Sequence, residues 1–120
     1  MFKHSNYREA IFFDGETIGT AAQVSTPIAN PKQAALRVVG WFGEEGATGT
    51  GSVAVKVQGA DKSDATEWTD IETGTFNSTG TADGEFFNKV VDADFNYIRA
   101  NVTGSGVTGK MNVAAEYIPR

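Results

Sequence analysis

The chain has 120 residues, a formal net charge of −5 and no cysteine. This length suits one domain that buries roughly two-thirds of its unfolded surface, and the lack of cysteine excludes disulfides, thiolate metal sites and thiol nucleophiles. The ten Lys and Arg residues are scattered singly, which argues against a nucleic-acid partner because phosphate binding requires clustered cations.

The N-terminus is expected to be an arm, Met1 to Arg8, followed by a single domain over residues 9–120. The opening MFKHSNYREAIFFDGE carries charges where a signal sequence would be apolar. No segment has the roughly 20 apolar residues needed to cross a membrane as a helix. We therefore expect a protein made in a reducing cytoplasm, with no membrane contact.

The first predicted elements are short. Glu9 to Phe13 is an apolar strand that the turn signal Asp14-Gly15 is expected to close. Thr17 to Thr26 is a weaker, Thr-rich candidate. The two prolines within Pro27 to Lys32 confine that segment to a loop or a sheet edge.

The middle of the chain contains the strongest strand signals. Ala34 to Phe42 has apolar residues on both faces, which predicts a central strand covered on both sides. Its alternation assigns residues 36, 38 and 42 to one face and residues 37, 39 and 41 to the other. Glu44 to Gly51 contains three glycines and is expected to be a flexible loop. Ser52 to Phe76 then predicts two strands joined by the polar loop GADKSDATE, because valines alternate with polar residues at 53–58.

The last third repeats the pattern. Asn77 to Glu85 is predicted to be a turn-rich connection before the strand Phe86 to Val91. Tyr97 to Thr103 and Lys110 to Ile118 are predicted strands on either side of the turn Gly104 to Gly109. About eight strands at this spacing predict an all-β, antiparallel β-sandwich of jelly-roll type, with a closed β-barrel as the alternative.

Two motif-like stretches are better explained as loops. Gly104 to Lys110, GSGVTGK, matches a dinucleotide-binding pattern by letter, but a strand pattern follows it where phosphate binding needs a helix. We expect a hairpin turn there. The carboxylates of Asp61, Asp64 and Glu67, and of Asp92 and Asp94, do not have EF-hand spacing and are expected to be solvated loop charges.

No catalytic set is visible, so we expect neither an enzyme nor a cofactor or metal site. The sole histidine, His4, lies in the arm, which leaves the domain without the usual general base. Trp68 and Trp41 have two open interpretations, as core aromatics or as exposed platforms for sugar rings, and core is favoured for Trp68. Arg99 either binds a partner's carboxylate or covers an aromatic ring, with the structural role slightly favoured.

The second half of the chain resembles a known family. Val57 to Asp61, Trp68 to Ile71 and Tyr97 to Asn101 match the recurrent pattern of the small jelly-roll-like capsid decoration, or cement, proteins of tailed bacteriophages. The resemblance covers about two-thirds of the chain, from residue 52 onward. Carbohydrate-binding and discoidin-like sandwiches share part of this pattern, so a glycan-binding module that uses Trp68 or Trp41 is the alternative.

The resemblance implies a structural virion protein on the exterior of a phage capsid. Its partner would be the major capsid protein, which it would bind as a homo-oligomer, with a trimer favoured over a dimer. It would stabilise the shell by binding the expanded form preferentially. The candidate contacts lie at the N-terminus: Phe2, Tyr7, Arg8 and Phe12.

Overall fold

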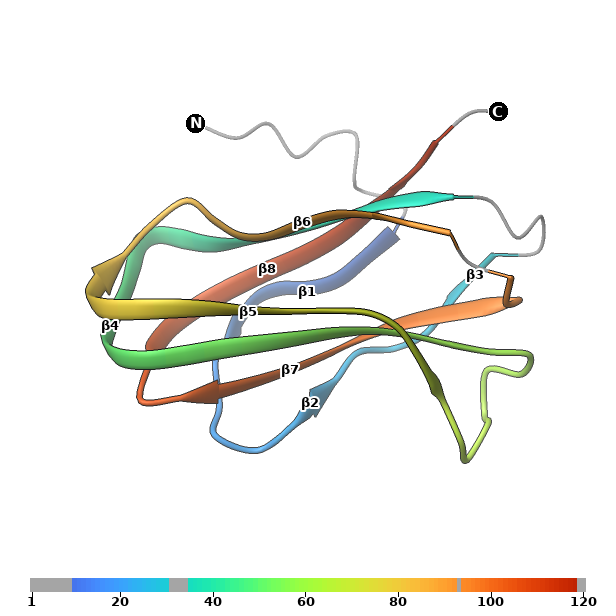
Figure 1. The fold of residues 1–120 in the computed structure, drawn as a ribbon, viewed down its shortest axis with the longest axis horizontal. Helices are drawn as coiled ribbons and strands as arrows, with labels where there is room; N and C mark the ends of the chain where they lie inside the picture. The colour runs from blue at the N-terminus through green and yellow to red at the C-terminus, as the bar shows by residue number, and fades with distance from the viewer. Residues whose placement is uncertain (1–9, 31–34, 93, 119–120) are drawn as a thin grey trace.

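The computed structural model describes residues 10–30, 35–92 and 94–118, and they form an antiparallel β-fold (Figure 1). The arm that was predicted over residues 1–8 lies outside the described residues, as do its candidate contacts Phe2, Tyr7 and Arg8. The strands are β1 (Ile11–Thr17), β2 (Gln23–Val24), β3 (Ile28–Ala29), β4 (Leu36–Ala60), β5 (Thr69–Ala82), β6 (Glu85–Val91), β7 (Tyr97–Ser105) and β8 (Thr108–Tyr117).

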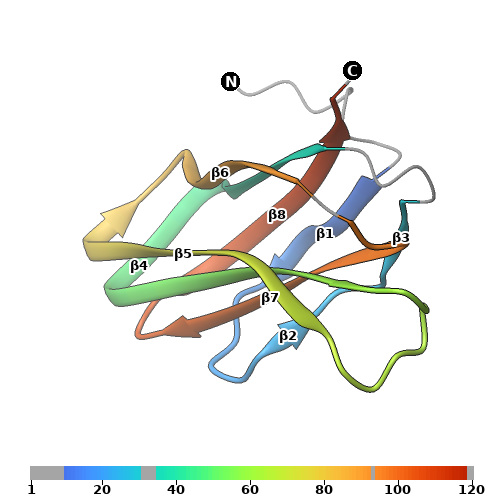
Figure 2. The same cartoon turned by 45° about the vertical axis from the view of Figure 1, so that its right-hand side comes forward.

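The strands form two layers that share β4. Residues 36–42 of β4 pair with β6 on one side and β8 on the other, and β1 extends this layer beyond β8. Residues 52–59 of β4 pair with β5 and β7, and β2 and β3 pair with the outer edge of β7. The layers β1-β8-β4-β6 and β2/β3-β7-β4-β5 have the jelly-roll order (Figures 1 and 2). β1 and β2 lie at the two ends of the strand order β1-β8-β4-β7-β2 and do not pair with each other, so the strands do not close into a barrel. The predicted sandwich is therefore confirmed.

The predicted loop at Glu44 to Gly51 is wrong, because β4 runs through it without a break. Pairing with β8 is interrupted between Phe42 and Ala47, and the strand bends there from one layer into the other. Gly46 and Gly49 have φ of +70° and +111°, which favour glycine. A Cβ on Gly51 would overlap the backbone carbonyl oxygen of Ser105. These glycines therefore permit a bend and a close backbone approach inside a strand.

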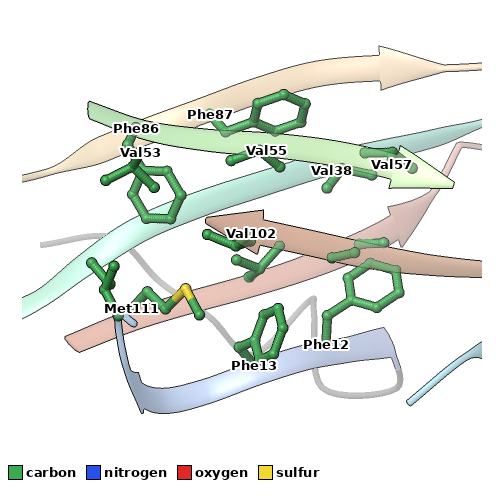
Figure 3. Close-up of a cluster of buried hydrophobic side chains, with 14 of the residues drawn as sticks. Phe12, Phe13, Val38, Val53, Val55, Val57, Phe86, Phe87, Val102 and Met111 are labelled. Carbon is green, nitrogen blue, oxygen red and sulfur yellow. The ribbon is translucent and has the colours of Figure 1, made fainter. Parts of the chain in front are cut away.

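The core lies between the two layers and follows the predicted alternation. Val53, Val55 and Val57 of β4 face Phe86, Phe87 and Met111 across the interior (Figure 3). Ile98, Ala100 and Val102 on β7 are fully buried, as predicted from their spacing. Phe42 contacts two aromatic rings: it meets Phe76 edge-on with centroids 5.5 Å apart, and its centroid lies 4.8 Å from that of Phe86.

β1 differs from the prediction in length and in the direction of its aromatics. Asp14-Gly15 does not end the strand, because Gly15 adopts φ +67° at a bulge and pairing with β8 resumes at Glu16. A second irregularity between Ile11 and Phe13 turns both Phe12 and Phe13 inward. Phe12, a candidate partner contact, is only 7% exposed and belongs to the core, so the structure does not support it as a surface contact.

Two predicted connections are also corrected. β5 continues through most of Asn77 to Glu85, and only residues 83–84 turn the chain into β6. The turn around Gly106 does lead into a strand and not a helix, but it is not a hairpin. β7 and β8 each pair with β4 and lie in different layers, so this turn crosses from one layer to the other.

Candidate binding surfaces

Three side chains form a hydrogen-bonded row across the outer face of β5-β4-β7. Asp70, Gln58 and Arg99, here called the Arg99 row, occupy matched positions on the three strands. Arg99 Nε donates to Gln58 Oε1 at 2.9 Å, and Gln58 Nε2 donates to Asp70 Oδ1 at 2.7 Å. Because Gln58 is only 7% exposed, its amide is held in one orientation by these two bonds.

The Arg99 guanidinium lies over the ring of Trp68. The Arg99 Cζ lies 4.3 Å from the ring centroid, and Trp68 Nε1 donates to the carbonyl oxygen of Ala65 at 2.9 Å. Trp68 is half-buried and is not part of the core, so its favoured interpretation as a core anchor is wrong. The predicted pairing of Arg99 with an aromatic ring is confirmed.

Charge on this face is unevenly paired. Lys56 Nζ lies 3.7 Å from Asp70 Oδ2, so Asp70 contacts both an ammonium and the Gln58 amide. Arg99 has no carboxylate within ion-pair distance among the described residues. Burial lowers the pKa of the Arg99 guanidinium from its ordinary value, although an arginine remains charged in any ordinary buffer.

The outer face of β1-β8-β4-β6 has a different character. Val39, Trp41 and Ala114, here called the Trp41 strip, form a second apolar cluster that is separate from the core and faces away from it. Trp41 is 8% exposed, so the structure does not offer its ring to a sugar. Two exposed apolar residues flank the strip: Ile11, opposite Ala114 on the edge strand β1, and Val90 on β6.

A shallow groove of about 610 Å³ lies at the bend of β4. Its lining comprises Thr17, Gly43, Glu44, Glu45, Gly46, Gly109 and Lys110. The acids that were predicted to be solvated, Asp61, Asp64 and Glu67, are exposed in the loop between β4 and β5. Within the described ranges, no three His, Cys, Asp or Glu residues lie close enough to hold a metal ion, and no helix is long and apolar enough to cross a membrane.

The sequence signalled part of these surfaces. The alternation in β7 placed Arg99 on the face opposite Ile98 and Ala100, but nothing in the sequence brought Trp68 beside it. Gln58 and Asp70 were not singled out. Their pairing depends on a β-bulge between Val57 and Gln58, which shifts the register of β5 against β4. Only an explicit alignment of the two strands with that bulge would have found it.

Comparisons with known proteins identify the fold and no family. No family model matches the chain, and no curated protein does. A Bacillus endospore appendage from a family of disulfide-linked pili has a similar structure, with a TM-score of 0.50 and 16% identity over 100% of this chain and 98% of its own. At this identity the likeness shows the β-sandwich fold.

Two further solved structures are similar at lower scores. The SPBc2 prophage-derived protein YomS has a TM-score of 0.42 and 14% identity, over 88% of this chain and 89% of its own. CBM28, a carbohydrate-binding module specific for non-crystalline cellulose, has a TM-score of 0.48 and 10% identity, over 82% of this chain and 65% of its own.

Proposed function

We propose that this chain is a non-enzymatic structural protein that binds the outer surface of a phage capsid and stabilises it as a decoration protein. The observation that carries the proposal is the pair of exposed apolar side chains, Ile11 and Val90, that flank the buried Trp41 strip on the outer face of β1-β8-β4-β6. Ile11 is 43% exposed and Val90 is 47% exposed. Exposed apolar side chains on one face of a small protein are candidates for contact with a protein partner.

The sequence resemblance from residue 52 onward supports the same role, and the proposed action is passive. Binding to the expanded shell in preference to its precursor shifts the shell toward the expanded form. Many copies on one particle, assembled as trimers, allow interfaces that are weak individually to hold together.

The test has two stages. Quantitative mass spectrometry of purified particles from the source is expected to find many copies of the protein per capsid. The double variant Ile11→Asp/Val90→Asp is then expected to lose at least tenfold in affinity for capsids stripped of the protein, because each charge is desolvated on binding. Co-sedimentation measures this loss.

Val24→Asp is the matched control. Val24 is 46% exposed and lies on β2, where it pairs with Asn101 of β7. Both strands belong to the layer that does not carry Ile11 and Val90, so the same change there should leave capsid binding intact. The proposal fails if the protein is absent from purified particles. The assignment of the contact face fails if Val24→Asp weakens binding as much as the double variant does.

A second candidate function is carbohydrate binding through the outer face of β5-β4-β7. The observation that favours it is the Trp68 ring, half-buried beside the polar Arg99 row. Aromatic rings next to fixed polar side chains are the usual composition of a ligand site. The variant Trp68→Ala is expected to abolish oligosaccharide binding, measured by calorimetry, while the protein stays folded.

A further inference from the structure

We propose that Arg99 recognises the carboxylate of a uronic acid residue within an oligosaccharide. This rests on the carbohydrate-binding function proposed above and adds the class of sugar and the residue that selects it. The site comprises Arg99, Trp68, Gln58 and Lys56 on the outer face of β5-β4-β7.

The Arg99 guanidinium is fixed in place with most of its donors unused. Its Nε–H bonds to Gln58, and its Cζ lies over the Trp68 ring. Of the five N–H groups that a guanidinium carries, the four on the terminal nitrogens bond to nothing among the described residues. A guanidinium held by a cation–π contact and one hydrogen bond, with two terminal nitrogens open, matches the two oxygens of a carboxylate.

The positive charge of Arg99 has no counter-charge beside it among the described residues. Arg99 is partly desolvated and has no acid beside it, so its charge is not neutralised within the described chain. The acid in its row, Asp70, contacts Lys56 and the Gln58 amide instead. A carboxylate from a ligand would therefore provide the negative charge that no side chain in the Arg99 row places beside Arg99.

The negative charge of the protein favours a sugar with one acidic residue over an acidic peptide as the ligand. The whole chain carries a net charge of −5, and Asp70 lies two strands from Arg99, so a run of several carboxylates would be repelled. A mostly neutral saccharide with one acidic residue avoids this repulsion. Its hydroxyl groups donate and accept, which suits a face that offers the Lys56 ammonium beside the Asp70 carboxylate.

The experiment compares an oligosaccharide ending in glucuronic acid with the same compound after reduction of its carboxyl group. By calorimetry at low salt, the unmodified protein is expected to prefer the acidic compound about tenfold, as expected for an arginine–carboxylate pair. Arg99→Lys keeps the charge but removes the planar fork, and is expected to lose most of the preference. Trp68→Ala is expected to lose both ligands.

Arg37→Gln is the matched control. Arg37 lies on the opposite layer, where its Nη1 donates to Asn88 Oδ1 at 3.0 Å, so its loss should leave the preference unchanged. Equal binding of the acidic and reduced compounds overturns the role of Arg99 but leaves the carbohydrate function standing. Binding of neither compound overturns both, and tighter binding of oligo-glutamate than of either sugar overturns the choice of ligand.

Discussion

The two tryptophans lie on opposite outer faces and differ in what surrounds them. Trp41 is almost fully buried in the Trp41 strip, whereas Trp68 is half-buried and contacts mainly a charged group. Period-2 alternation assigned Trp41 and Val39 to the face opposite Leu36 and Val38, which is confirmed. Alternation reveals which side chains share a face but not how deeply each outer face is covered, so it could not rank the two tryptophans.

We expect the two alanine variants to differ clearly in stability. Trp41→Ala removes a buried aromatic and should lower the free energy of unfolding by about 3–5 kcal/mol. Trp68→Ala removes one cation–π contact and one hydrogen bond, and should cost about 1–2 kcal/mol. Urea denaturation followed by circular dichroism measures both, and equal losses would contradict the difference in burial. A small loss in Trp68→Ala also shows that any loss of sugar binding is local.

β4 is the element that the sequence predicted least well. Both of its ends were recognised, because Leu36, Val38 and the valines at 53, 55 and 57 alternate cleanly. The stretch between them was assigned to a loop on the strength of its glycines. In the structure these glycines lie within the strand: two adopt positive φ at its bend, and Gly51 allows the backbone of β4 to approach Ser105 closely. Composition alone does not distinguish a glycine-rich loop from a bent strand with a close backbone approach, since both favour a residue without a Cβ.

Two glycines in β4 provide a test of that explanation. Gly51→Ala is expected to destabilise the protein by about 1–3 kcal/mol, because its Cβ would overlap backbone that cannot turn aside. Gly43→Ala is the control, since a Cβ there would lie 3.5 Å from Lys110 Cβ, an ordinary contact. Thermal unfolding of both variants measures the effect. If Gly51→Ala is as stable as Gly43→Ala, close approach does not explain the glycine.

At the scale of the molecule, the sequence predicted the architecture and left the surfaces open. Eight strands in a jelly-roll sandwich followed from alternation and spacing, although two predicted strands proved to be one. The weak candidate Thr17 to Thr26 shrank to the two residues of β2, and the segment expected to be a loop or a sheet edge holds the short edge strand β3. The Arg99 row could not be predicted, because it joins residues 58, 70 and 99 through pairings that only the folded sheet creates. The register between paired strands determines which side chains lie next to one another on the face of a sheet, and a bulge in a single strand can change that register.

The sharing of β4 between both layers also affects how the protein opens. Residues 36–42 and 52–60 belong to one continuous backbone that supplies a central strand to each layer, so neither layer can separate without disrupting β4. Native-state hydrogen exchange is therefore expected to show one cooperative unit, with the slowest amides of β7 and β8 exchanging at the same free energy of opening. Distinctly different values for the two strands would show that the layers unfold independently.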